Sequence, residues 1–213
     1  MDMEILILIV VLIFSVIIHE YFHGAVAYSL GDDTAKNMGR LTLNPIPHLD
    51  IIGSIILPFL LIFISILTGG GGIIFGWAKP VPINPNNFRD RKYGELKVAL
   101  AGPLANFSLA LIFGLLLRFL PHFIYMPGIY YVFSYIVYLN LLLCVFNLFP
   151  VPPLDGSHVL FFFFPHLEEK ATIFFSQFGL LIIFFVIFFL SPYLTIIIDF
   201  IFKLIVGKSI VSF

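Results

Sequence analysis

Long apolar segments constrain this chain more strongly than any other feature of its sequence. A helix needs about 20 consecutive apolar residues to cross the hydrocarbon core of a bilayer, and several segments approach or exceed that length. Only 11% of the 213 residues are charged, whereas soluble domains carry about 25%. We therefore predict an all-α, polytopic integral membrane protein that forms one membrane-embedded domain over residues 1–213. The apolar segments cover residues 3–30, 51–67, 95–120, 129–149, 171–190 and 192–206.

Segment 51–67 differs from the others because it is short and contains Pro58. Six of the eleven basic residues fall in the polar stretches that flank it, residues 31–50 and 69–94. Basic loops tend to stay in the cytoplasm, so both stretches are predicted to be cytoplasmic and 51–67 to be a re-entrant hairpin. The six residues are Lys36, Arg40, Lys79, Arg89, Arg91 and Lys92.

This charge pattern leaves about five transmembrane helices, with the N-terminus outside. Lys203 is then predicted on the cytoplasmic side and Arg118 on the outside. The Gly and Pro content of residues 69–94 predicts an extended, membrane-associated loop rather than a helix. No basic residue precedes Lys36, so residues 3–30 are predicted to remain as a helix and not to be cleaved as a signal peptide.

Charge and cysteine content exclude several other classes of protein. The net charge of −1 gives no electrostatic reason to expect nucleic-acid binding. The single cysteine, Cys144, excludes an internal disulfide and a cysteine-rich metal site. Any metal ion would therefore have to be bound by His, Asp or Glu.

Three polar residues, His19, Glu20 and His23, interrupt the first apolar segment and form the pattern His-Glu-x-x-His. Polar side chains are costly inside an apolar span, and this composition predicts on the order of 0.004 chance matches. On a helix, His19 and His23 lie one turn apart on one face and can bind one zinc ion. Glu20 can then act as a general base and as proton donor to the leaving amine. The alternative is a helix end where the three side chains reach toward water.

A catalytic zinc site needs a third protein ligand, and the best candidate is Asp155 in the sequence NLFPVPPLDG (147–156). An ordinary helix-ending turn is the alternative for this stretch. His23 and Asp155 can reach one ion only if an even number of crossings separates them. The topology above gives two crossings, so it agrees with a re-entrant 51–67 and places the zinc toward the cytoplasmic side.

With these motifs in this order, the chain resembles the site-2 proteases, a family of intramembrane zinc metalloproteases. The sequences GWAKPVPINP (76–85) and AGPLANF (101–107) also resemble the compact bacterial and archaeal branch, and the resemblance covers about residues 10–160. It implies a catalytic core at residues 3–160, followed by C-terminal helices at residues 171–206. Neither a PDZ nor a CBS domain, which many members carry, is recognised within the sequence.

The resemblance also implies roles for individual residues. His19, His23 and Asp155 would bind one Zn²⁺ per chain. Glu20 would be the catalytic base, and Asn147 would position the substrate or stabilise the oxyanion. The substrates would be transmembrane segments of membrane proteins, cleaved near the cytoplasmic face of the bilayer.

Two other functions stay open, a membrane metal carrier and an inactive scaffold that binds helices, and the sequence does not predict the oligomeric state. Residues 69–88 could pair with an unwound substrate as an added β-strand. Asn106 and Asn140 are predicted to make helix–helix hydrogen bonds. His48 could border the active site but is predicted to be a loop residue at the membrane interface, and His158 could support the metal ligands.

Overall fold

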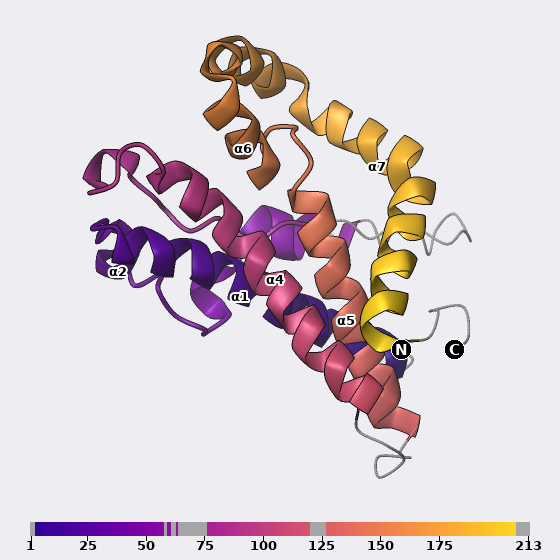
Figure 1. The fold of residues 1–213 in the computed structure, drawn as a ribbon. Coiled ribbons are helices and arrows are strands. Elements are labelled where there is room, and N and C mark those ends of the chain that lie inside the picture. Colours follow the sequence, from indigo (N-terminus) through magenta and orange to yellow (C-terminus); the bar gives the residue numbers. More distant parts are fainter. Residues whose placement is uncertain (1–2, 58, 61–62, 64–75, 120–126, 208–213) are drawn as a thin grey trace.

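The computed structural model describes residues 3–57, 59–60, 63, 76–119 and 127–207, and every regular element within them is a helix (Figure 1). The long helices are α1 (Met3–Ser29), α4 (Gly94–Phe119), α5 (Pro127–Asn147) and α7 (Glu168–Val206). Two short α-helices are α2 (Thr34–Asn37) and α6 (Asp155–Phe163). Single turns of 3-10 or π helix are η1 (Ile46–His48), η2 (Ile51–Ile56), η3 (Pro85–Asn87) and η4 (Pro165–Leu167).

Four helical stretches of the described chain are long and apolar enough to cross a membrane. The predicted all-α membrane protein is therefore confirmed, and the described residues contain four candidate membrane spans, where about five transmembrane helices were predicted. The segment 51–67 lies partly outside these residues, so its re-entrant path stays a prediction. The four stretches are Leu6–Ser29, Gly94–Phe119, Gly128–Asn147 and Phe188–Val206.

Segments 171–190 and 192–206, predicted as two helices, form one continuous helix, α7, with Pro192 inside it. Proline usually ends a helix, since it cannot donate a hydrogen bond to the carbonyl four residues earlier. Here that carbonyl belongs to Phe188, and it accepts a hydrogen bond from the Ser191 hydroxyl at 3.3 Å. A side chain that satisfies the freed carbonyl makes proline tolerable in a membrane helix. Figure 1 shows that α7 changes direction along its length.

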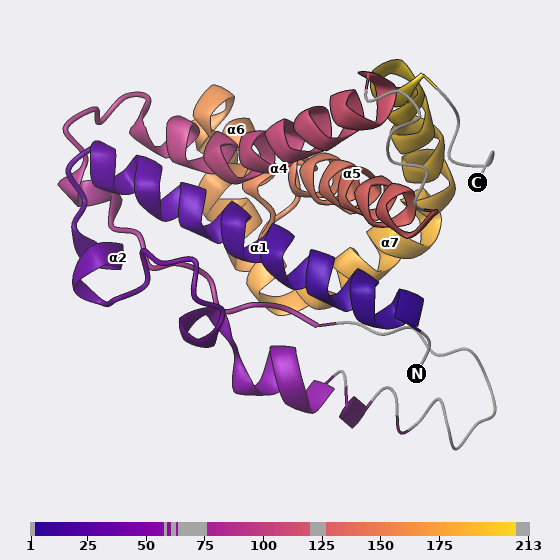
Figure 2. The ribbon, with the colours of Figure 1, turned by 90° about the horizontal axis from the view of Figure 1, so that it is seen from below.

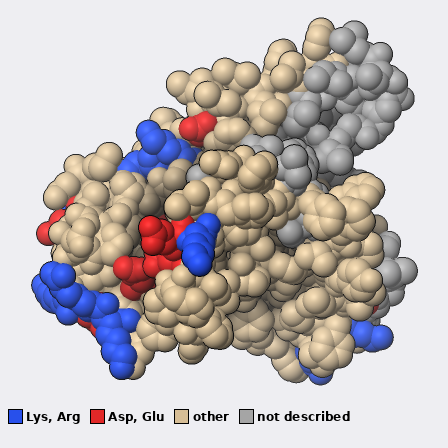
Figure 3. Space-filling model, turned by 90° about the horizontal axis from the view of Figure 1, so that it is seen from above, with Lys and Arg blue, Asp and Glu red and all other residues tan. Residues whose placement is uncertain are grey.

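As a result, the start of α1 and the end of α7 lie at the same end of the helix bundle (Figure 1). Arg118, near the end of α4, donates a hydrogen bond to the Leu204 carbonyl at 2.8 Å. Lys203 therefore lies at the same end as Arg118, whereas the two were predicted on opposite sides of the membrane. Most charged side chains visible in Figure 3 gather instead on the side of α2 and the start of α4.

Helix α4 contacts α1, α5, α6 and α7, and Figure 2 shows it beside α5. Its buried face consists mainly of glycine and alanine, which lets neighbouring helices approach closely. Near the middle of α4, Ala110 packs in a cluster with Val137 and Leu141 of α5 and with Ile198 and Phe202 of α7. This packing fixes α4 as the support against which the other helices are positioned.

A Pro-rich turn, residues 148–154, joins α5 to α6 and brings α6 against α4. The turn is tight because Gly156 has no side chain. A Cβ at this position would overlap the Leu148 carbonyl and come within 2.5 Å of the Phe149 carbonyl oxygen. Glycine at 156 thus allows α6 to begin close to the end of α5, with Asp155 as its first residue.

Candidate metal centre

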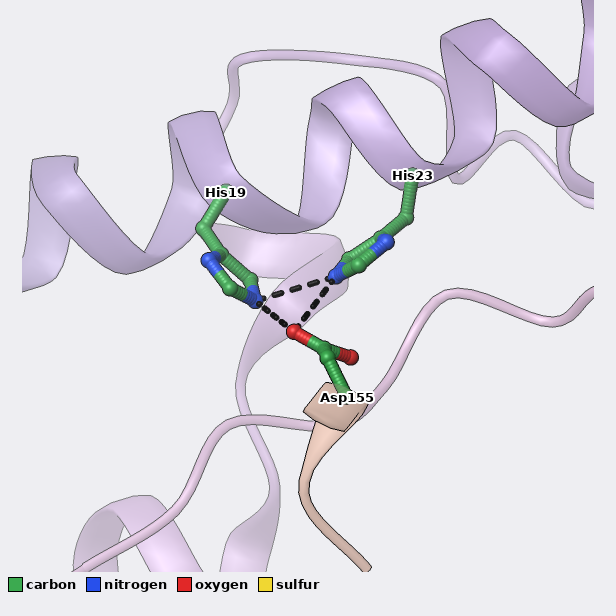
Figure 4. Close-up of side chains that lie close together, drawn as sticks. All are labelled: His19, His23 and Asp155. Atoms are coloured by element: carbon green, nitrogen blue, oxygen red, sulfur yellow. Dashed lines mark hydrogen bonds and ion pairs between the residues drawn. The ribbon is translucent and has the colours of Figure 1, made fainter. Parts of the chain in front are cut away.

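The side chains of His19 and His23 on α1 converge with that of Asp155 at the start of α6 (Figure 4). His19 Nε2 and His23 Nε2 are 3.0 Å apart. Asp155 Oδ2 lies 3.1 Å from His19 Nε2 and 3.3 Å from His23 Nε2. Both histidines are 6% exposed. The sequence thus predicted correctly which residues come together, although they are separated by more than 130 positions.

Hydrogen bonds to the Nδ1 atoms of the two rings determine which ring nitrogen carries the proton. His19 Nδ1 lies 2.6 Å from the Asn106 side-chain oxygen, and His23 Nδ1 lies 2.7 Å from the Val98 carbonyl oxygen. Both oxygens only accept, so each neutral ring carries its proton on Nδ1 and presents a lone pair at Nε2. This is the arrangement of metal-binding histidines in general.

Asp155 Oδ2 adds a third acceptor, and it is buried with no hydrogen-bond donor among the described residues. Three lone pairs within 3.3 Å of one another repel unless a cation lies between them. Ligands on a tetrahedral zinc ion with bonds of about 2.0–2.1 Å lie roughly 3.3 Å apart. The donor set and its spacing therefore fit a zinc ion.

Gly102 on α4 leaves the space that such an ion requires. A Cβ at this position would overlap His23 Nε2 and would lie 2.5 Å from both Cε1 and Nε2 of His19. Any side chain at 102 would therefore fill the space in front of both imidazoles. Sequence reasoning missed this residue, although it belongs to the quoted stretch AGPLANF.

Glu20, the predicted base, points to the same cavity but is held by a different part of the chain. Its Oε2 accepts a hydrogen bond of 2.7 Å from the Val81 backbone N–H. The cavity has a volume of about 360 Å³. Glu20 and Asn147 line it together with His19, His23 and Asp155. Asn147 is the last residue of α5, and its amide donates to the Leu143 carbonyl at 2.9 Å. The other polar residues that line the cavity are Glu95 and His158.

The extended stretch 76–84 runs alongside α1, and two carboxylates hold it there. Glu20 binds the Val81 N–H, and Asp32 accepts a 2.7 Å hydrogen bond from the Asn84 N–H. Asp32 is fully buried and also accepts from the Thr34 hydroxyl and the Asn87 amide. Burial raises the pKa of Asp32, but these donors outweigh it and lower the pKa below its usual value. Sequence reasoning did not identify this role of Asp32.

His48 lies apart from the centre. It is 2% exposed, its Nε2 lies 2.9 Å from the Thr42 carbonyl oxygen, and it does not line the cavity. Its backbone carbonyl accepts from the Lys79 N–H at 2.9 Å. His48 is thus a buried residue that supports the start of the extended stretch, and its place at the membrane interface stays a prediction.

Comparison with known proteins identifies the family. The model of peptidase family M50 matches residues 122–190. "Putative zinc metalloprotease YwhC" of Bacillus subtilis (strain 168) is 43% identical over 160 residues, which cover 72% of this chain and 67% of that protein. "Putative zinc metalloprotease Rip2" of Mycolicibacterium smegmatis is 31% identical over 175 residues, covering 79% of this chain and 61% of the relative.

A third, shorter match is "Putative zinc metalloprotease MJ0611" of Methanocaldococcus jannaschii, 42% identical over 66 residues, or 30% of this chain and 32% of the relative. The chain therefore spans about two thirds of the length of YwhC and of Rip2. No solved structure matches the chain. The resemblance predicted from the motifs is confirmed: the chain is an integral membrane protein that belongs to peptidase family M50, the zinc metalloproteases of the site-2 protease family.

Proposed function

We propose that this protein is an intramembrane zinc endopeptidase that hydrolyses peptide bonds in transmembrane segments of membrane proteins. His19, His23 and Asp155 would bind one zinc ion, with Glu20 as the general base. The observation that carries the proposal is the convergence of three buried acceptor atoms with Glu20 at one cavity, built from helices that can cross a membrane. Polar groups in such helices mark functional sites by default, because burying them there is costly.

Zinc bound at this centre would supply a water activated at neutral pH and a Lewis acid for the scissile carbonyl. Glu20 directly follows His19 in the sequence and lines the cavity, so we assign to it the role of accepting a proton from water and passing it to the leaving amine. The Val81 N–H holds the Glu20 carboxylate through Oε2. The other oxygen, Oε1, is the atom to which we assign the proton.

Asn147 is proposed to orient the substrate carbonyl. It lines the cavity at the end of α5, and Asp155 lies eight residues later in the chain. Its side-chain nitrogen donates to Leu143 in this structure. A primary amide has a second N–H, which can donate to a carbonyl oxygen bound in the cavity.

The proposed orientation places the cavity toward the cytoplasm. The six basic residues of stretches 31–50 and 69–94 belong to the loops at the end of the bundle that holds the centre. Arg118 and Lys203 lie at the opposite end. The basic residues thus still favour a cytoplasmic site. With four crossings, both ends of the described chain would then face outward.

Pairing of a substrate strand with stretch 76–84 is more restricted than its extended form suggests. Alternate residues of an extended chain point their N–H groups to opposite edges. The N–H groups of Trp77, Lys79 and Val81 already bind Gly53, His48 and Glu20. On the other edge, Pro80 and Pro82 have no N–H. The Trp77 carbonyl already accepts from Ser54, and the Lys79 and Pro80 carbonyls accept from Arg40. We therefore propose that a substrate strand would contribute mainly donors, paired with other carbonyls of this stretch.

The test is cleavage of a panel of single-span reporter proteins by purified protein in detergent or liposomes, with bound zinc measured in the same samples. Wild type is expected to bind one zinc per chain and to cleave reporters within the membrane-spanning segment. Asp155→Ala should lose both zinc and cleavage, whereas Glu20→Gln should lose only cleavage. Cleavage that survives in Glu20→Gln would refute the assigned base, and a wild type without zinc would refute the proposed function.

A further inference from the structure

Three polar residues lie completely inside the bundle, next to the metal centre but not part of it. They are Ser15 on α1, Asn106 on α4 and Asn140 on α5, with exposed fractions of 3%, 0% and 0%. Burying an amide without partners costs several kcal/mol in an apolar medium. Hydrogen bonds between helices would explain their presence, as predicted, but these contacts also lead directly to His19.

The contacts determine how each amide is oriented. Asn140 Nδ2 donates to the Ile136 carbonyl and to Ser15 Oγ, both at 2.8 Å. The Asn140 oxygen then faces Asn106 and accepts from its Nδ2 at 2.7 Å. Asn106 Nδ2 also donates to the Ser15 carbonyl at 3.2 Å. Because backbone carbonyls only accept, neither amide can be reversed without placing two oxygens against each other.

With its nitrogen fixed in this way, Asn106 must present its oxygen to His19 Nδ1, at 2.6 Å. His23 has no such requirement, since its Nδ1 donates to the Val98 backbone carbonyl, which belongs to a helix and cannot rotate. The two histidines are thus oriented by different means. The acceptor for His19 is a rotatable side chain, and it needs further residues to select one of its two orientations.

We propose that Asn140 and Ser15 are positioning residues for the metal centre, which act on His19 through the amide of Asn106. The inference rests on the proposed function, because it assumes that His19 binds zinc through Nε2. If the Asn106 amide reverses, its N–H groups face His19 Nδ1, and the ring proton is driven to Nε2, where it blocks the lone pair. Zinc affinity should therefore depend on a residue two hydrogen bonds away from the ligand.

The experiment measures zinc affinity by competition with a chelator, on purified folded protein in detergent, without any assay of cleavage. Removing the partner of a ligating histidine typically weakens metal binding 10–100-fold. We expect Asn106→Leu to approach the upper value and Asn140→Leu to weaken zinc binding about tenfold. Ser15→Ala leaves the Ile136 carbonyl as a partner for Asn140, so its effect should be about threefold, as for one hydrogen bond between membrane helices.

The matched control is Leu141→Ala, next to Asn140 on α5. Leu141 is 1% exposed and packs in the apolar cluster with α4 and α7, so its truncation should lower the unfolding temperature. It should leave zinc affinity and the visible spectrum of the Co²⁺-substituted protein unchanged. Asn140→Leu should alter that spectrum, because the geometry of one ligand changes.

Each outcome separates this inference from the proposed function. Wild-type zinc affinity in both Asn140→Leu and Ser15→Ala would overturn the inference and leave the metal centre intact. An equal loss of zinc in Leu141→Ala would also overturn it, since general destabilisation would then explain the effect. If wild type itself bound no zinc, the proposed function would fail instead.

Discussion

Replacing Gly102 by alanine tests the metal centre with the smallest change that the chain offers. The added methyl group would overlap His23 Nε2 and lie 2.5 Å from Cε1 and Nε2 of His19. Normal contacts between carbon and nitrogen atoms are about 3.5–4.0 Å, so the rings or the two helices must separate by roughly 1 Å. Metal sites tolerate deviations of about 0.2 Å in ligand distance. We therefore expect zinc affinity to fall at least 100-fold.

For the stability of the fold, we expect Gly102→Ala to be destabilising, although helix propensity alone predicts that it stabilises. Alanine stabilises an exposed helix by about 0.5–1 kcal/mol relative to glycine. At position 102 the overlap with two buried rings should instead cost about 1–3 kcal/mol. The measurements are bound zinc by metal analysis, zinc affinity by chelator competition, and the unfolding temperature with and without zinc.

Gly114→Ala provides the matched control, with the same substitution three turns further along α4. There the added methyl group would overlap Cγ2 of Ile205 on α7, far from the histidines. The control should lower stability by a similar amount but keep wild-type zinc affinity. Wild-type zinc binding in Gly102→Ala would refute the assignment of this space to the metal. Equal loss of zinc in Gly102→Ala and Gly114→Ala would also refute it, because overpacking alone would then explain the loss.

Three further predictions concern the cavity and the extended stretch beside it. Glu20→Gln should slow reporter cleavage by about 10²–10⁴-fold with zinc content unchanged; normal rates would exclude Glu20 as base. Asn147→Ala should lower kcat while zinc affinity stays within twofold of wild type, and a large zinc loss would indicate a ligand or a structural role instead. Asp32→Asn should cost about 1–3 kcal/mol of unfolding free energy at pH 7. The pKa of Asp32 is lower in the folded protein than in the unfolded chain. The ionised carboxylate therefore contributes to the free energy of unfolding at pH values above its unfolded pKa of about 3.9, and this contribution is lost as the pH falls through the lower, folded-state pKa. Wild type should thus lose more stability than Asp32→Asn in that range, as followed by thermal unfolding, and parallel curves would contradict this.

The sequence predicted the identity of the converging residues because two simple rules apply to them. Helical periodicity places His19 and His23 on one face, and counting membrane crossings places Asp155 at the same depth. Among the residues that the structure describes, two candidate crossings, α4 and α5, lie between them, and the path of segment 51–67 stays a prediction. Neither rule depends on how side chains pack, so both could be applied before a structure existed.

The main difference from the predicted fold lies in α7. Segments 171–190 and 192–206 were predicted as two helices, but the Ser191 hydroxyl satisfies the carbonyl that Pro192 leaves free, and α7 continues through both. That single difference moved Lys203 to the opposite end of the bundle.

The support for the metal centre was harder to predict, since it depends on the register between two helices that are far apart in sequence. On α4, the residues Val98, Gly102 and Asn106 are spaced by four and therefore share one face. Val98 binds His23 and Asn106 binds His19, so α4 runs antiparallel to α1 at this point. Gly102 lies between the two partners, opposite the gap between the imidazoles. The two histidines, four residues apart on α1, thus face a glycine on α4 that has a histidine partner four residues before it and another four residues after it. Shifting α4 by one residue would remove both histidine partners and the space for the metal at once, so the register of this helix pair is itself a requirement of the site.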